Sequence, residues 1–208
     1  MTTHNSSADG TNTAAVRNAI GKKNVVLVGM MGAGKTSIGK RLAAELDIPF
    51  VDADNEIEAA ANMTIPEIFE TYGEQHFRDG ERKVIARLLR DGPRVIATGG
   101  GAVADPETRQ RIGRKSIAIW LKADVEVLLE RVKRRSNRPL LEADDPERVL
   151  RRLAAEREPF YSCADITVRS HNAPHQNVVS EILSRLDDRL NGERRHDPAA
   201  VRQKGPQR

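Results

Sequence analysis

One segment near the N-terminus constrains the fold more than any other part of the chain. Residues 25–37 read VVLVGMMGAGKTS, in which an apolar run passes directly into the pattern Gly-x-x-x-x-Gly-Lys-Thr. This pattern is typical of a phosphate-binding loop that joins a buried parallel strand to a helix. Its glycines allow backbone N–H groups to turn toward a phosphate, and the positive end of the helix dipole lies at the same place. The segment therefore predicts a nucleotide-binding α/β domain.

The residues of this loop have expected tasks in nucleotide binding. Lys35 can place its charge against the β- and γ-phosphates of ATP, and the Thr36 hydroxyl can hold Mg²⁺. A glycine-rich turn that binds nothing is the alternative, but the strand pattern before the loop and the helix pattern after it favour a nucleotide. We therefore expect ATP to be bound by Gly32, Ala33, Gly34, Lys35, Thr36 and Ser37.

Length and composition limit the number of domains and the class of partner. The chain has 208 residues, a formal net charge of +4 and only 3% aromatic residues. We place a single compact domain at residues 22–190, and the polar ends at 1–21 and 191–208 are predicted to be disordered tails. The arginines cluster without the aromatic residues of a base-stacking platform. Small polyanions are therefore favoured as partners, and no nucleic acid is expected.

Cysteine content and hydropathy bear on the compartment. The single cysteine, Cys163, cannot form an internal disulfide and suits a reducing cytoplasm. No apolar stretch approaches the ~18 residues that a membrane-spanning helix needs. We expect a monomeric cytoplasmic protein with no membrane partner.

Short apolar segments alternate with helical patterns along the chain. Five segments have the β-branched, apolar character of buried parallel strands, at residues 24–28, 49–52, 95–98, 116–121 and 165–168. Helical periodicity covers residues 35–46, 55–61, 65–72, 73–90, 106–114, 124–133, 146–161 and 177–190. This alternation predicts a three-layer α/β/α fold with a five-stranded parallel sheet. Ligands of such sheets bind beyond the carboxyl ends of the strands.

Polar motifs follow two of these predicted strands. Asp52 and Asp54 follow the second, and at a spacing of two on extended backbone both carboxylates would face one cleft. One could help to hold Mg²⁺, and the other could orient or deprotonate an acceptor hydroxyl. The alternative is that Asp54 and the next residue only cap a helix. The third strand leads into Gly99, Gly100 and Gly101, where a substrate could lie against bare N–H groups, although a flexible turn would also explain three glycines.

Three arginines are candidates for anion binding. Arg78 lies at helical spacing from Glu81, and an arginine held by a glutamate makes a good clamp for a carboxylate or phosphate. Such a pair is more often a surface salt bridge. Arg138 lies in a segment, 134–146, that we expect to be a mobile lid that brings Arg138 to the transferred phosphate. Arg157 ends the next helical pattern and is expected to point to the top of the sheet.

In this order and spacing, six motifs resemble those of shikimate kinases. They are GMMGAGKT at 29–36, DAD at 52–54, GEQHFR at 73–78, GGG at 99–101, RPLL at 138–141 and REPFY at 157–161. The phosphate loop is shared by many families, whereas the other five together are specific. The resemblance implies a P-loop core like that of nucleoside monophosphate kinases. It also implies ATP-dependent phosphorylation of the 3-hydroxyl of shikimate, the fifth step of the chorismate pathway.

On the acceptor side, the resemblance implies a shikimate site built on the segment at about 53–90 and on the glycine run. Arg78 and Arg157 would bind the carboxylate of shikimate. Asp54 would contact its hydroxyls and act as the base, and the glycines, Gly100 above all, would contact the ring hydroxyls. The implied substrate-binding residues are Asp54, Arg78, Gly99, Gly100, Gly101 and Arg157.

On the nucleotide side, the resemblance implies that Arg131 stacks on adenine and that Arg138 engages ATP. Mg²⁺, the expected cofactor, would be held by Thr36 and, through water, by Asp52. The implied catalytic residues are Lys35, Asp54 and Arg138.

The family also closes its adenine site with a residue shortly after the fifth strand. Residues 171–176 do not align cleanly with that pattern, so we expect the closing residue between Pro174 and Gln176.

Two other functions use parts of the same pattern. A gluconate kinase or an adenylate kinase would have the same core and a different acceptor. A nucleotide sensor or a nucleic-acid-binding NTPase would need the phosphate loop and the arginines but no acceptor pocket. The combination of DAD, GGG and RPLL favours shikimate.

Overall fold

Five parallel strands form a single sheet in the computed structural model, which describes residues 11–133, 145–171 and 174–196. The strands are β1 (Asn24–Val28), β2 (Phe50–Asp52), β3 (Val95–Ala97), β4 (Ser116–Lys122) and β5 (Ile166–Arg169). Their order is β2-β3-β1-β4-β5, and every pair is parallel. The prediction of a five-stranded parallel sheet is therefore confirmed.

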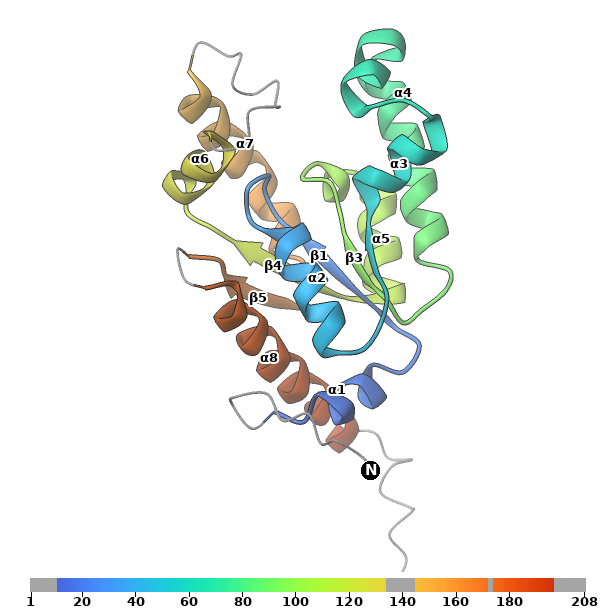
Figure 1. Ribbon diagram of the computed structural model, residues 1–208, viewed down its shortest axis with the longest axis vertical. Coiled ribbons are helices and arrows are strands. Elements are labelled where there is room, and N and C mark those ends of the chain that lie inside the picture. The colour runs from blue at the N-terminus through green and yellow to red at the C-terminus, as the bar shows by residue number, and fades with distance from the viewer. Residues whose placement is uncertain (1–10, 134–144, 172–173, 197–208) are drawn as a thin grey trace, which may run out of the picture.

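Helices cover both faces of this sheet (Figure 1). They are α1 (Thr13–Ile20), α2 (Lys35–Glu45), α3 (Ala53–Ala61), α4 (Ile65–Leu88), α5 (Pro106–Lys115), α6 (Val125–Lys133), α7 (Pro146–Tyr161) and α8 (His175–His196), with a short 3₁₀ turn η1 (Ala102–Ala104). In Figure 1, α2 and α8 lie in front of the sheet, and α5 and α7 lie behind it. The central strand β1 is buried along its whole length because side chains from both layers pack on it.

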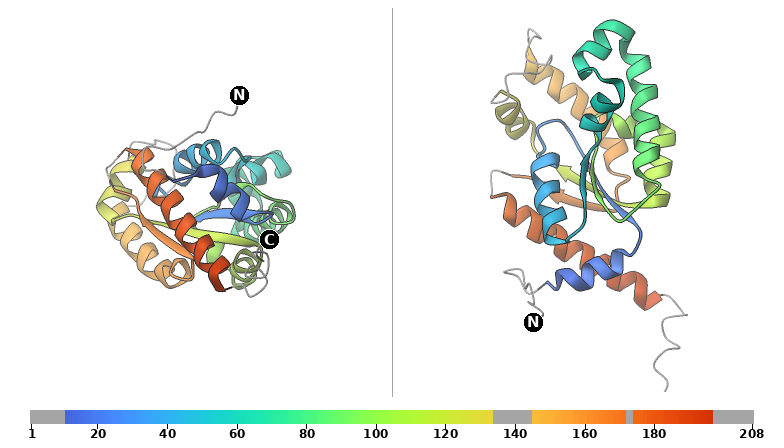
Figure 2. Two further views of the ribbon diagram at one scale, coloured as in Figure 1. Left: turned by 90° about the horizontal axis from the view of Figure 1, so that it is seen from below. Right: turned by 45° about the vertical axis from the view of Figure 1, so that its right-hand side comes forward.

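Helices α3 and α4 rise above the carboxyl end of the sheet on one side, and α6 and α7 rise on the other (Figures 1 and 2). Helix α4 begins with a capping box between Thr64 and Glu67 and is kinked at Gly73, whose φ is 79°. Because the backbone at Gly73 is not helical, the prediction of two helices that meet between residues 72 and 73 is confirmed, and α4 comprises both. The arrangement leaves the strand ends between two raised pairs of helices.

The N-terminal segment differs from the prediction. Residues 1–21 were expected to form a disordered tail, and this is wrong for residues 13–20, which form α1. Asn12 caps the helix by accepting a hydrogen bond from Ala15 N at 3.0 Å. Val16 and Ile20 are 0% and 2% exposed, and the helix packs against α8. The Ser- and Thr-rich composition of the first residues obscured a short apolar stripe at helical spacing.

The C-terminal boundary and the end of the lid segment also differ from the prediction. Helix α8 continues past the predicted limit at residue 190 to His196, so the predicted tail at 191–208 is wrong for residues 191–196. Of the lid predicted at 134–146, residues 134–144 lie outside the described part of the chain. Asp145 and Pro146 instead begin α7, where Asp145 caps the helix by accepting from Arg148 N. Among the described residues, no helix combines the length and the apolar character needed to cross a bilayer.

Candidate active site

The phosphate loop lies between β1 and α2, as the sequence predicts. It begins at Gly29, whose φ of 137° and whose closeness to β4 leave no room for a side chain, because a Cβ there would lie 2.6 Å from Leu121 O. Lys35 Nζ donates to the carbonyls of Gly29 and Met30, at 2.7 and 3.0 Å. The loop therefore holds an ammonium group at the carboxyl end of the central strand.

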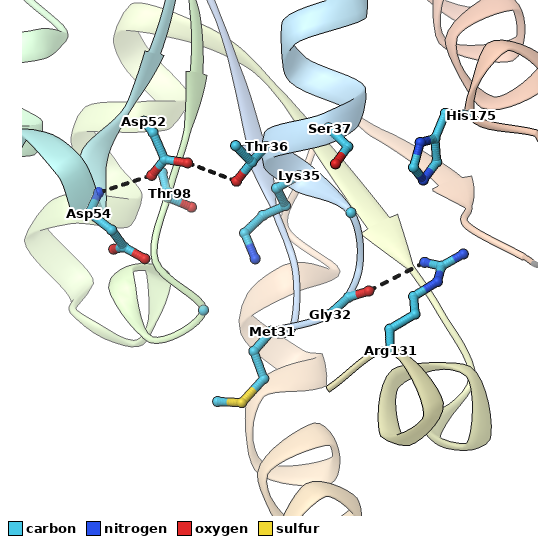
Figure 3. A pocket seen from close by; sticks show the side chains of 12 residues that line it. Met31, Gly32, Lys35, Thr36, Ser37, Asp52, Asp54, Thr98, Arg131 and His175 are labelled. Carbon is cyan, nitrogen blue, oxygen red and sulfur yellow. Dashed lines mark hydrogen bonds between the residues drawn. The ribbon is translucent and has the colours of Figure 1, made fainter. Parts of the chain in front are cut away.

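Asp52 connects the phosphate loop to the next strand. Its Oδ2 accepts a hydrogen bond from Thr36 Oγ1 at 2.7 Å, and its Oδ1 accepts from Asp54 N at 3.1 Å (Figure 3). Asp52 is the N-cap of α3, whereas Asp54 lies in the first turn of that helix. The expectation that both carboxylates project from extended backbone is therefore wrong, and so is the alternative of a cap at Asp54, because Asp52 caps the helix. Both side chains still face one pocket because the strand ends where the helix begins.

A pocket of about 270 Å³ covers the phosphate loop and the ends of three strands. Its lining comprises Met31, Gly32, Gly34, Lys35, Thr36, Ser37, Asp52, Asp54, Thr98, Gly100, Arg131 and His175. In the view of Figure 3, the Lys35 ammonium lies between Asp54 on one side and Arg131 on the other. Ala33, predicted to bind ATP, is fully buried and does not line this pocket.

After β3, Gly99 and Gly101 make room for three charged side chains, and Gly100 lies in ordinary contact distance of a fourth. A Cβ on Gly99 would lie 2.7 Å from Glu81 Oε1 and 2.9 Å from Asp54 Oδ1. A Cβ on Gly101 would lie 2.6 Å from Arg78 Nη1, and one on Gly100 would lie 3.5 Å from Arg157 Nη1. The glycine run is therefore the surface on which α3, α4 and α7 bring their charged groups together.

Arg78 is fixed by two glutamates on its own helix. Its Nη1 donates to Glu81 Oε2 at 2.8 Å, and its Nη2 donates to Glu74 Oε1 at 3.1 Å. Glu81 is only 4% exposed; burial raises the pKa of its carboxyl, and the bond from Arg78 acts in the opposite direction. The predicted pairing of Arg78 with Glu81 is confirmed, and the ion pair is partly buried rather than fully exposed at the surface.

The other side of the pocket contains Arg131 and the segment after β5. Arg131 Nη1 donates to Ser170 Oγ at 3.0 Å, and Nη2 donates to His171 O at 2.7 Å. Of the three residues 174–176 proposed to close the adenine site, His175 lines the pocket. Burial lowers the pKa of His175, and the nearby charges of Arg41 and Arg131 lower it further, which favours the neutral imidazole.

Two residues that line the pocket were not predicted from the sequence. Thr98, whose Oγ1 donates to Leu27 O at 3.1 Å, and Met31 line the pocket without having been predicted. The only features of the sequence that could have identified them are the position of Thr98 directly before the glycine run and that of Met31 inside the phosphate loop. Arg138 lies outside the described residues. Within the described ranges, no three His, Cys, Asp or Glu side chains form a metal-binding cluster.

Comparison with known proteins gives a consistent family. A family model for shikimate kinase matches residues 31–187. A shikimate kinase of Bradyrhizobium diazoefficiens is 57% identical over 187 residues, covering 90% of each chain. One of Nitrobacter winogradskyi is 59% identical over 176 residues, covering 85% of this chain and 82% of that protein.

Solved structures agree with the sequence relatives. The shikimate kinase of Acinetobacter baumannii in complex with shikimate has a TM-score of 0.79 and 38% identity, covering 84% of this chain and 98% of that chain. The shikimate kinase of Aquifex aeolicus has a TM-score of 0.68 and 35% identity, covering 81% of this chain and 99% of that chain. With the phosphate loop and the clustered charges at its strand ends, this chain belongs to the shikimate kinase family of small-molecule kinases.

Proposed function

We propose that this chain transfers the γ-phosphoryl group of ATP to the 3-hydroxyl of shikimate, with Mg²⁺ bound, and releases shikimate 3-phosphate and ADP. One observation carries the proposal: the glycine run, whose Gly100 lies against Met31 of the phosphate loop, gathers Asp54, Arg78 and Arg157 around it. A nucleotide site and a site for a hydroxylated acid thus share one edge of the sheet. Membership of the shikimate kinase family supports this choice of acceptor.

On the acceptor side, Arg78 and Arg157 bind the carboxylate of shikimate. Two guanidinium groups from different helices suit a planar carboxylate because each offers paired donors. Glu81 and Glu74 hold Arg78 in place, so little side-chain freedom is lost on binding. Asp54, which lies against Gly99 at the edge of the pocket, orients the 3-hydroxyl and accepts its proton.

On the nucleotide side, the backbone of residues 32–37 and the Lys35 ammonium bind the phosphates. The Thr36 hydroxyl and the Asp52 carboxylate, which share a 2.7 Å hydrogen bond, are hard oxygen donors of the kind that Mg²⁺ prefers. These two residues fit the ion, with Asp52 acting through water. When bound, Mg²⁺ neutralises charge on the phosphate oxygens.

Catalysis then rests on positioning and on charge stabilisation. Lys35 stabilises the negative charge of the transferred group while Asp54 keeps the hydroxyl aligned for in-line attack. Arg138 engages the transferred phosphate from the lid. Arg131 and His175 bind the base, because an arginine plane and a neutral imidazole can both stack on adenine.

The cellular setting is part of the proposal. We place the enzyme in the cytoplasm, in the biosynthesis of aromatic amino acids, and the exposed thiol of Cys163 is compatible with a reducing compartment. We also propose a monomer, because Phe69 and Tyr72 are the only exposed large hydrophobic side chains in the described part of the chain.

A coupled assay of ADP release tests the function. Shikimate, gluconate and AMP are each offered with ATP and Mg²⁺, and shikimate alone is expected to support turnover. Phosphorylation of gluconate or AMP in the absence of activity on shikimate would overturn the proposal. Omission of Mg²⁺ should abolish the reaction, and sedimentation of the enzyme should give the mass of one chain.

A further inference from the structure

Tyr161 lies between the glycine run at residues 99–101 and the phosphate loop. It ends α7, four residues after Arg157, and is 1% exposed. Its hydroxyl donates to the carbonyl of Gly100 at 2.5 Å and lies 3.6 Å from the Met30 sulfur. Gly100 belongs to the glycine run, which we call the acceptor loop because it borders the proposed shikimate site, and Met30 belongs to the phosphate loop. One buried phenol therefore touches both.

The hydroxyl has a defined chemical state. Burial raises the pKa of Tyr161 to about 12, although the charge and the hydrogen bond of Arg157 act in the opposite direction. The phenol is thus protonated at any working pH and has one hydrogen to donate. A carbonyl oxygen is a much stronger acceptor than a thioether, so the hydrogen is committed to Gly100. The side chain of Arg157 forms a hydrogen bond with the phenol oxygen of Tyr161.

The ring is held as firmly as the hydroxyl. It stacks on Trp120 with a centroid separation of 5.8 Å, and Trp120 itself packs beneath Gly29, where Cδ1 lies 3.4 Å from the position of a Cβ. The phenol ring therefore packs on Trp120 of β4, which in turn packs against the first residue of the phosphate loop. A phenylalanine could fill the same volume, so packing alone does not require the hydroxyl.

We propose that Tyr161 is a positioning residue for phosphoryl transfer: its hydroxyl fixes the Gly100 carbonyl and the Arg157 side chain relative to the phosphate loop. This inference rests on the proposed function and adds a residue that contacts neither substrate. Phosphoryl transfer is sensitive to sub-ångström errors in the separation of donor and acceptor. A rigid link between the glycine run and the phosphate loop meets that need, because the proposed shikimate-binding side chains pack against the glycine run and the phosphates of ATP bind the phosphate loop.

The test is the Tyr161→Phe variant, which removes one oxygen and keeps the ring. We expect kcat/KM for shikimate to fall about tenfold or more, with a raised KM for shikimate, since an acceptor loop without its tether binds shikimate less well. The Kd for ADP, measured by calorimetry without shikimate, should stay within about twofold. A purely structural effect would instead lower the active fraction, which reduces kcat and leaves both KM values unchanged.

The chain offers a matched control. Tyr72, the only other tyrosine, is 56% exposed on α4 and stacks on His76. Tyr72→Phe makes the same chemical change at an exposed side chain that is none of the residues assigned to shikimate or ATP, and it should leave all constants unchanged. If wild type and Tyr72→Phe phosphorylate shikimate and Tyr161→Phe does so equally well, the inference fails while the proposed function stands. If wild type itself ignores shikimate, the proposed function fails.

A second measurement does not depend on the folding of Tyr161→Phe. In the Tyr72→Phe variant, biosynthetic incorporation of 3-fluorotyrosine places one fluorine label, at position 161. Its ¹⁹F resonance should shift when shikimate alone is added and also when ADP alone is added, because the phenol touches both loops. A resonance that responds to neither ligand would overturn the proposal, as would a response to ADP only.

Discussion

A methyl group on Gly101 should damage the acceptor site without straining the backbone. Gly101 has φ −94° and ψ −11°, which alanine adopts freely. The added Cβ would lie 2.6 Å from Nη1 and 2.9 Å from Nη2 of Arg78, whereas ordinary contact begins at 3.4 Å. The guanidinium must therefore retreat by about 0.8 Å, the difference between 3.4 and 2.6 Å. It cannot do so easily, because it is bonded to the buried Glu81.

The size of the effect follows from what the displacement breaks. A hydrogen bond between charged groups contributes about 1.5–3 kcal/mol, which corresponds to roughly 10- to 150-fold in binding. A misplacement of about 1 Å at a binding group can cost ~100-fold in rate. We therefore expect the KM for shikimate to rise about 10- to 100-fold in Gly101→Ala, while the KM for ATP stays within about twofold.

The measurement is a coupled assay of ADP release with each substrate varied in turn. The control is Gly113→Ala in α5, where a Cβ would meet nothing within 4 Å. That change should leave the kinetics intact and stabilise the protein by about 0.5–1 kcal/mol, because alanine is the better helix former. A Gly101→Ala enzyme with a normal KM for shikimate would refute the assignment of Arg78, and so would an increase seen only for ATP.

Three further changes test other parts of the structure. Asp54→Asn should lower kcat by roughly 10²–10⁴ and leave ADP binding unchanged in calorimetry, since it removes the proposed base; near-normal turnover would reject that role. His175→Ala should raise the KM for ATP about 2- to 10-fold through lost stacking, and an effect on shikimate alone would contradict its placement at the base. Ile20→Ala should cost about 2–5 kcal/mol and lower the melting temperature by at least about 4 °C, because the side chain is 2% exposed against the core. An unchanged melting temperature would mean that α1 does not dock in solution.

Local patterns were enough for the sheet and the phosphate loop. Both depend on residues that are neighbours in the chain: apolar β-branched runs for the strands, and the glycines and Lys35 for the loop. The same reasoning failed for α1, because its stripe of two buried apolar side chains, Val16 and Ile20, is too short to stand out from a polar composition. It also failed for the geometry of Asp52 and Asp54. Asp52 is both the last residue of β2 and the N-cap of α3, so the alternation of a strand does not extend to Asp54.

Local pattern and family resemblance were enough to identify the nucleotide loop and the order of strands and helices along the chain. They also identified the set of charged residues at the strand ends. Which of these residues meet was decided by packing. From the sequence, Glu81 was predicted only as a partner of Arg78 on the same helix, and Tyr161 was only the last residue of a motif. The fold buries both against the glycine run because that run has no side chains to keep α3, α4 and α7 apart. Contacts between residues 60 or more positions apart depend on the shape of the whole sheet edge, and no local pattern encodes that shape.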